Sequence, residues 1–183
     1  MRYLYVLMGL AVLASIAYAS AGSFKVEMDV STYVDASNPN ASFSDNNTLL
    51  VASANGEPTK ETYLSFKNNF GSVGIFKPDR ISSATLVINI QKVEKPGKIN
   101  AYFVHGPTFD TATWTDRPEY ESSASSSLDV QKAGQYTIDV TPIIKKAVET
   151  CIEDCPYSIV LVSNDASIEL SKEKKPTLEY TAN

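Results

Sequence analysis

Residues 82–93, SSATLVINIQKV, carry the pattern that decides the fold. Every second residue from Leu86 to Ile90 is a large aliphatic residue, and smaller or polar residues stand between them, from Thr85 to Gln91. A period of two places alternate side chains on opposite faces of a β-strand. We therefore expect a strand here with one face in a hydrophobic core.

Runs of the same kind recur along the chain and are separated by Pro, Gly, Asn, Asp and Ser. The other expected strands are 24–30, 33–34, 49–54, 62–67, 98–105, 135–140, 158–163, 167–170 and 177–181. Many short strands without alternating helices predict an all-β fold, an antiparallel two-sheet β-sandwich or jelly roll. The serine-rich segment Ser122–Ser127 is expected to be a flexible loop between strands.

One short α-helix interrupts the strands. Thr141 can cap it, Pro142 suits its first position, and we expect it to end near Thr150. Its apolar residues recur at helical spacing: Ile143, Ile144, Ala147 and Val148. The stripe they form indicates that the helix covers one end or edge of the sandwich.

The first 21 residues have the order of a secretory signal peptide. Arg2 precedes an apolar run, Tyr3–Ile16, which is shorter than a membrane span, and small residues offer cleavage after Ala19 or Ala21. The alternative is an uncleaved membrane anchor. We expect residues 1–21 to be removed and residues 22–183 to form a single β-sandwich domain with no membrane span, secreted or held at the cell surface.

Export agrees with the two cysteines of the chain, Cys151 and Cys155, which we expect to form a local disulfide. A metal-binding or redox pair is the alternative, but it needs further ligands or a C-x-x-C spacing, and the sequence offers neither. Asn40 and Asn46 head glycosylation sequons in a polar stretch, so both are candidate glycosylation sites in an exported protein.

The composition excludes several classes of function. The 183 residues are 43% hydrophobic and 20% charged, as in a globular protein, and 16 basic against 21 acidic residues give a net charge of -5. An acidic chain without a basic block is not expected to bind nucleic acid. His105 is the only histidine, and the sequence has no G-x-S-x-G motif, so we do not expect an enzyme.

Acidic residues at expected strand ends and in loops leave a structural Ca²⁺ open as the one metal to consider. These residues are Asp29, Asp35, Asp45 and Asp129. They lack the D-x-D-x-D-G spacing of a calcium loop, so no ligands are assigned, and no cofactor is expected.

Eight segments, in this order, resemble the DNRLRE-domain family, also described as carbohydrate-binding module family 96. They are Thr32–Val34, Ser37–Phe43, Leu49–Ser53, Glu61–Phe66, Ile81–Leu86, Ala112–Pro118, Ile138–Thr141 and Lys175–Tyr180. The resemblance covers about residues 29–181 and rests on the order and spacing of the motifs. One departure is Lys172, which stands where the family's S-R-E motif has arginine.

The resemblance implies a jelly-roll-like, extracellular, non-catalytic module that binds polysaccharide or a cell-surface glycan. Its candidate ligand-binding residues are Trp114, Arg117 and Tyr120, because sugar rings dock on aromatic faces and Arg can bind hydroxyls or a uronate carboxylate. The alternative role is structural: Trp114 would anchor the packing, and Arg117 would fix its loop to a buried carboxylate. For Tyr33, Tyr63 and Tyr102, surface and core positions both remain open.

A second function belongs to a different class, a structural subunit of an extracellular filament, pilus, sheath or biofilm matrix. The strand expected at 24–30 directly follows the cleavage site. It could complete the open sheet of a neighbouring subunit and so build a polymer by donor-strand contacts. The two functions differ in whether this strand pairs within its own chain or with a neighbour.

Overall fold

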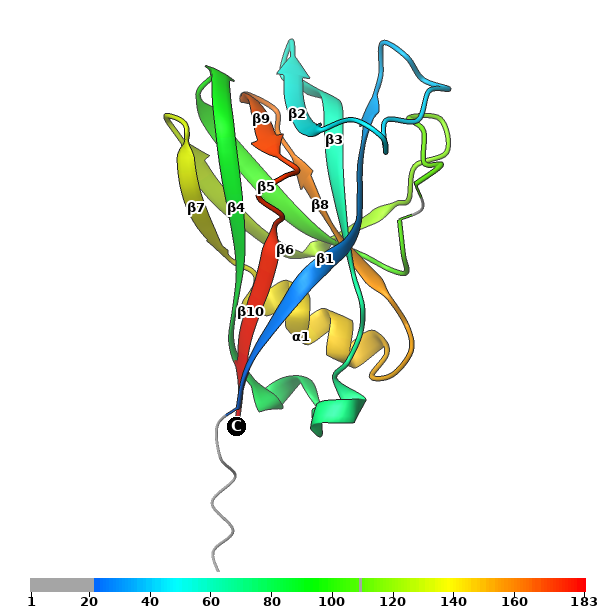
Figure 1. Cartoon of the computed structure of the whole chain (residues 1–183), viewed down its shortest axis with the longest axis vertical. Coiled ribbons are helices and arrows are strands. Elements are labelled where there is room, and N and C mark those ends of the chain that lie inside the picture. The colour runs from blue at the N-terminus through cyan, green and yellow to red at the C-terminus, as the bar shows by residue number, and fades with distance from the viewer. Residues whose placement is uncertain (1–21, 109) are drawn as a thin grey trace, which may run out of the picture.

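Ten β-strands, one α-helix and two short 3₁₀-helices make up the regular structure of residues 22–108 and 110–183, the part of the chain that this computed structural model describes (Figure 1). The strands are β1 (Gly22–Asp35), β2 (Thr48–Ala54), β3 (Glu57–Phe66), β4 (Ile81–Lys95), β5 (Gly97–Val104), β6 (Tyr120–Val130), β7 (Gly134–Asp139), β8 (Tyr157–Val162), β9 (Ser167–Ser171) and β10 (Thr177–Ala182). The helices are α1 (Thr141–Thr150), η1 (Gly71–Val73) and η2 (Pro78–Arg80). The predicted signal peptide lies outside the described residues.

The strand pairs are all antiparallel, which confirms the all-β prediction. The neighbours run β1-β10-β4-β9-β2-β3-β8-β5-β6, and β7 pairs with β4. The strands surround one main hydrophobic core in a sandwich-like or barrel-like arrangement. The finer jelly-roll assignment with two separate sheets stays a prediction, because β1 and β2 each pair in both strand groups.

The strand β4 shows why the sequence period fixes the core. Leu86, Ile88 and Ile90 are almost fully buried, while the residues between them are only half-buried. Each buried aliphatic side chain contributes about 1.5–3 kcal/mol by leaving water. A slip of one residue in the pairing of β4 would turn all three toward solvent, so the register is strongly specified.

Two neighbours of β4 follow each other along one of its edges. Thr85 pairs with both Asp139 of β7 and Glu179 of β10, and Ile90 pairs with both Gly134 of β7 and Leu170 of β9. Since β7 occupies one edge of β4 from Thr85 to Ile90, β9 and β10 lie in line along the other edge. Between them the chain leaves the sheet at residues 172–176, which we call the KEKKP excursion.

The N-terminal strand β1 pairs within its own chain. Gly22–Glu27 pair with β10, and Met28–Asp35 pair with β3, so one continuous strand covers the two runs expected near residues 24–34. Donor-strand exchange would require β1 to leave both of these partners. The geometry of the single chain therefore gives the filament alternative no support.

The helix α1 covers one end of the strands, as its apolar stripe predicts (Figure 1). The capping prediction was wrong: the residue before the helix is Val140, and Thr141 is already helical. The Thr141 hydroxyl accepts a hydrogen bond from the backbone of Ala84 at 2.9 Å and donates to Asp139 at 2.6 Å. Thr141 therefore joins the helix to β4 instead of capping it.

The expectation of a loop at Ser122–Ser127 was also wrong, because these residues lie within β6. Ser125–Ser127 pair with β5, and the register shifts before them; Ala124 is buried in the core while the serines on either side of it are exposed. β6 is the last strand of the pairing order, so within the described part of the chain one of its edges has no paired strand. Small polar side chains suit an edge strand with a solvated face, and composition alone cannot separate this case from a flexible linker.

Candidate functional site

Two long loops meet over the outward face of β1, β3, β8 and β5. Thr115 donates its backbone N–H to Pro39 at 3.0 Å and its hydroxyl to Pro39 at 3.0 Å, and Ser42 donates to the backbone of Asp110. The strands beneath are buried on both faces, since a second apolar cluster lies under the loops. Its members are Val34, Tyr63, Val104, Ala112, Val160 and Val162, with Tyr102 and Trp114 packed against them.

Trp114 is half-buried and contacts both the second cluster and Arg117. Its ring packs on the second cluster, and the Arg117 guanidinium lies 4.0 Å from the centre of the ring. A cation over an indole face contributes about 0.5–1 kcal/mol at a partly exposed position. These contacts agree with the structural alternative for Trp114, and its role in ligand binding stays a prediction.

Arg117 reaches the buried carboxylate that the structural alternative predicts, and that carboxylate is Glu61. Arg117 Nε lies 3.2 Å from Glu61 Oε2, and Arg117 Nη1 donates to the Trp114 carbonyl at 2.6 Å. Tyr63 donates its hydroxyl hydrogen to Glu61 Oε2 at 2.9 Å and lies 3.1 Å from the Pro118 carbonyl. The two β3 residues Glu61 and Tyr63, on one face of the strand, thereby hold the loop from Trp114 to Pro118 in place.

Burial controls the charge state of this network. Burial raises the pKa of the Glu61 carboxyl, and Arg117 and the Tyr63 hydroxyl oppose the rise. Burial also raises the pKa of Tyr63, which keeps it protonated as a hydrogen-bond donor. Arg117 Nε and one N–H of Nη1 are engaged with Glu61 and Trp114, so a uronate would have to bind the remaining N–H groups, and its binding by Arg117 stays a prediction.

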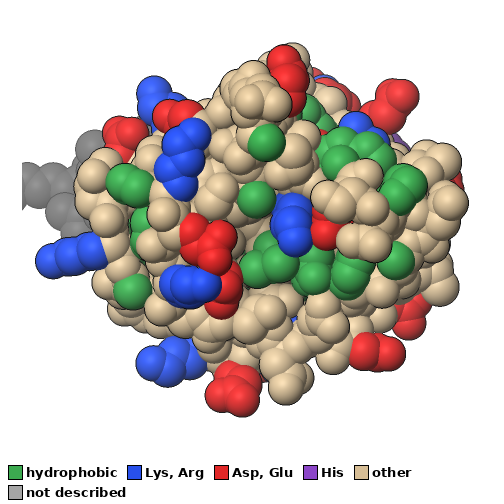
Figure 2. All heavy atoms as spheres, turned by 90° about the horizontal axis from the view of Figure 1, so that it is seen from above, with side chains coloured by type: hydrophobic (Ala, Val, Ile, Leu, Met, Phe, Trp, Pro, Cys, Tyr) green, Lys and Arg blue, Asp and Glu red, His purple; other side chains and the backbone are tan. Residues whose placement is uncertain are grey.

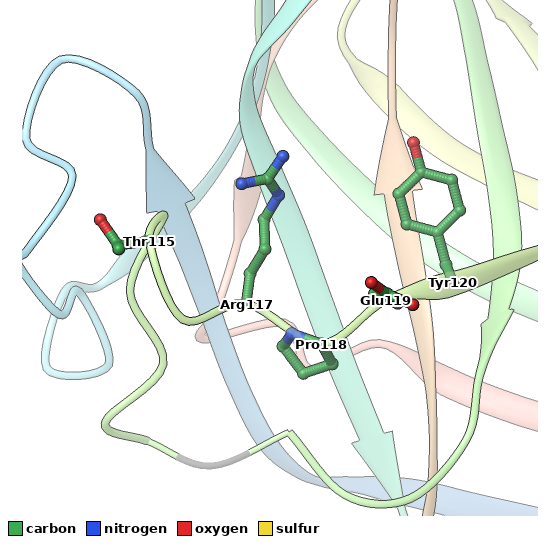
Figure 3. A pocket seen from close by; sticks show the side chains of 5 residues that line it. All are labelled: Thr115, Arg117, Pro118, Glu119 and Tyr120. Atoms are coloured by element: carbon green, nitrogen blue, oxygen red, sulfur yellow. The ribbon is translucent and has the colours of Figure 1, made fainter.

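Tyr120 is a predicted site residue whose aromatic ring faces solvent. It is 37% exposed, and its ring stacks on Tyr102 with the centroids 4.8 Å apart and the planes at 20°. Next to it lies a hollow of about 440 Å³. The hollow is lined by Thr115, Arg117, Pro118, Glu119 and Tyr120. Figure 3 shows Arg117 and Tyr120 extending in the same direction, with Glu119 between them.

Four residues in and beneath this surface were not predicted from the sequence: Glu61, Tyr102, Thr115 and Glu119. The position of Glu61 two residues before Tyr63 was a signal in the sequence, because both side chains share one face of the strand. The stacking of Tyr102 on Tyr120 depends on the pairing of β5 with β6. The prediction of a loop at residues 122–127 excluded this strand, so the pairing could not be predicted.

The remaining predicted sites are the two cysteines and the two asparagines of the glycosylation sequons. Cys151 and Cys155 form a disulfide after α1. Asn40 and Asn46 are both exposed; Asn40 accepts a hydrogen bond from Thr115 at 3.1 Å, and Asn46 donates one to Tyr33 at 2.9 Å. Their use as glycosylation sites stays a prediction.

Residues 22–108 and 110–183 contain neither a cluster of metal ligands nor a helix that could span a membrane. No three or more His, Cys, Asp and Glu side chains in these segments lie together in a way that could hold a metal ion. Of the candidates for calcium, Asp29 and Asp35 instead lie 3.4 and 3.1 Å from Lys67 and Lys60. The same segments contain no helix with the length and apolarity needed to cross a bilayer.

Comparison with protein families gives a match to carbohydrate-binding module family 96 across residues 22–181, nearly the whole described chain. The chain belongs to carbohydrate-binding module family 96. This confirms the resemblance seen in the sequence motifs and places the protein among carbohydrate-binding modules. A search of curated proteins found no match.

Solved structures give only distant likenesses to this family 96 chain. A chain of deformed wing virus, a honeybee pathogen, matches at 10% identity and a TM-score of 0.35 over 99% of this chain, which spans 60% of the viral chain. The xylan-binding module CBM15 matches at 9% identity and a TM-score of 0.38, over 88% of this chain and 97% of the CBM15 chain. A family 30 module of a Clostridium thermocellum cellulase matches at 10% identity and a TM-score of 0.37, over 85% of this chain and 96% of the module. TM-scores this low support no further statement about the chain.

Proposed function

We propose that this family 96 chain is an exported, non-catalytic module that binds polysaccharide at the surface around Tyr120. The observation that carries the proposal is the family match across residues 22–181. Removal of residues 1–21 as a signal peptide and folding of residues 22–183 as one β-sandwich domain complete the proposal. The disulfide between Cys151 and Cys155 agrees with an extracellular location.

The Tyr120 surface has the parts that sugar binding needs. One face of the Tyr120 ring is backed by Tyr102, which leaves the other face for the apolar side of a sugar ring. Thr115 and Glu119 line the same hollow and offer a hydroxyl and a carboxylate to sugar hydroxyls. An aromatic platform with a few placed polar groups is the usual composition of a site for a small organic ligand.

The charges around the site favour a neutral polysaccharide over an acidic one. The chain has a net charge of -5, and Asp116 and Glu119 are both exposed beside the hollow. Arg117, the nearest cation, is paired with Glu61. Seen from the end opposite α1, side chains of both signs are interspersed between patches of hydrophobic side chains, as Figure 2 shows. The carboxylates of Asp116 and Glu119 would repel an anionic chain here.

Glu61 is the carboxylate with a raised pKa at this site, and its surroundings indicate a structural role. It is 2% exposed and lies against both Arg117 and Tyr63, so neither substrate nor water reaches it. A general acid has to lie within hydrogen-bonding distance of the reacting group. This supports a binding module over a glycoside hydrolase.

Affinity electrophoresis and pull-down experiments test the proposal. The neutral polysaccharides are cellulose, xylan and mannan, and polygalacturonate is the acidic polysaccharide. We expect binding to at least one neutral polysaccharide, weakened about tenfold by Tyr120→Ala, since an aromatic contact contributes about 0.5–1.5 kcal/mol beyond the area it buries. Phe76→Ala is the matched control, because Phe76 is 58% exposed but lies between η1 and η2, away from this hollow. If Tyr120→Ala kept the full affinity, the binding site would lie elsewhere on the protein. If the protein bound none of these polysaccharides, the proposed function would be wrong.

A further inference from the structure

A second hollow lies on the other strand group, where the chain switches from β9 to β10 along β4. Leu170 is the last β9 residue that pairs with β4, at Ile90, and Thr177 is the first β10 residue that does, at Val87. The KEKKP excursion leaves the sheet between these two points. The hollow beside it has a volume of about 640 Å³, larger than the hollow at Tyr120.

Three side-chain amides line this hollow on the outward face of the sheet. Asn89 and Gln91 alternate along β4 with the buried Ile88 and Ile90, and Gln135 of β7 is the direct cross-strand partner of Asn89. Side chains paired in this way share one face and lie about 5 Å apart. Each amide offers one acceptor and two donor hydrogens in a plane, which matches the neighbouring hydroxyls of a sugar.

The KEKKP excursion forms the opposite wall and is held at both ends. Lys172 donates its ammonium to the Ser44 carbonyl, and Lys174 donates its backbone N–H to Ser171 at 3.2 Å. Pro176 is buried at the start of β10. Glu173 and Lys174 are the two charged residues that line the hollow, and both are exposed. Their charges are opposite, so the lining has no net charge, whereas Lys172 and Lys175 of the excursion are not among the lining residues. The combination suits a neutral ligand rich in hydroxyl groups.

We propose that the hollow formed by Asn89, Gln91, Gln135 and the KEKKP excursion is a second polysaccharide site, so that one chain holds two polysaccharide strands at once. The inference rests on the proposed function as a carbohydrate-binding module. The two sites lie on different strand groups: Figure 1 shows β4 and β7 at one side of the molecule and the loop that follows β5 at the other. A module with two such sites cross-links polysaccharide and binds the polymer more tightly than a single short fragment.

The test begins with isothermal titration of the signal-free protein with cellohexaose, xylohexaose and mannohexaose. We expect two hexasaccharides per chain for the native protein and one for Asn89→Ala/Gln135→Ala. Thr137→Ala/Thr177→Ala is the matched control, because Thr137 and Thr177 both pair with Val87, one step along the same outward face. The control is expected to keep both sites. Circular dichroism of every variant confirms that the fold is intact.

Light scattering of a soluble form of the bound polysaccharide then measures cross-linking. Scattering should rise with the native protein and stay low with Asn89→Ala/Gln135→Ala and with Tyr120→Ala, although each variant still binds the polymer, at least tenfold more weakly. One site per native chain, or two sites in Asn89→Ala/Gln135→Ala, overturns the second site and leaves the proposed function standing. Absence of binding by the native protein in every titration overturns both.

Discussion

Removal of Arg117 should destabilise the fold through the carboxylate that it leaves behind. Breaking a buried ion pair by removing one partner costs about 3–5 kcal/mol. The Glu61 side chain is 3% exposed but that of Arg117 is 35% exposed, so water partly replaces the guanidinium, and we expect about 2 kcal/mol for Arg117→Met. For a domain of this size that free energy corresponds to a decrease in Tm of about 4–8 °C.

The pH dependence of this loss identifies its cause. Because burial raises the pKa of Glu61, the folded protein holds this proton more tightly than the unfolded chain, and stability decreases as the pH rises through the folded pKa. The charge of Arg117 opposes the rise in the pKa of Glu61, so removal of Arg117 raises that pKa further and makes the decrease in stability larger. The deficit of Arg117→Met should therefore be largest near pH 8 and shrink as the pH falls and Glu61 takes up its proton.

Urea unfolding followed by fluorescence between pH 4 and pH 8 measures the free energy of unfolding of both proteins. In a Glu61→Gln background Arg117→Met should cost only about 1 kcal/mol, for the lost contacts with Trp114. Lys25→Met is the control, since its ion pair with Glu179 is exposed and contributes at most about 1 kcal/mol. A deficit for Arg117→Met that is small and constant with pH would refute the reasoning.

Three further predictions concern α1 and its surroundings. Asp139 accepts hydrogen bonds from the side chain and the backbone of Thr141, and these bonds lower the pKa of Asp139. Asp139→Ala should therefore lower the free energy of unfolding by about 0.5–1 kcal/mol at pH 7. In urea unfolding at a series of pH values, this loss should disappear as the pH drops through the lowered pKa. Reduction of Cys151–Cys155 should cost about 2 kcal/mol or less, because the closed loop is short; a loss of all cooperative unfolding on reduction would contradict this. Ile144→Ala should cost about 2–4 kcal/mol in urea unfolding, and a value under 1 kcal/mol would mean that α1 does not seal the core.

The parts of the fold that follow from local pattern could be predicted from the sequence. The stripe from Ile143 to Val148 identified α1, and alternation identified β4, because burial of one face leaves a periodic trace. The missed strand was β6, whose serines leave no such trace. Its edge position and its pairing with β5 come from tertiary structure, which overrides the composition of a short segment.

The candidate site divides in the same way. Trp114, Arg117 and Tyr120 were accessible from the family motif and from the chemistry of their side chains. Glu61 as the partner of Arg117, and Tyr102 as the support of Tyr120, come from strands distant in sequence, and only the pairing of β3, β8, β5 and β6 brings them to the loop. The hollow beside the KEKKP excursion depends on three strands meeting at β4, which no single segment specifies.

The pairing of Gly22 with Ala182 brings the two ends of the described chain together. The backbone of Asn183 is also held there, since it donates to Arg80 at 2.9 Å. A bead, a fluorescent label or a fusion protein attached at either end would therefore leave from the same pole of the molecule, beside η2 and α1, away from the loops around Trp114 (Figure 1). The orientation of an immobilised module would then be the same whichever end carries the tether.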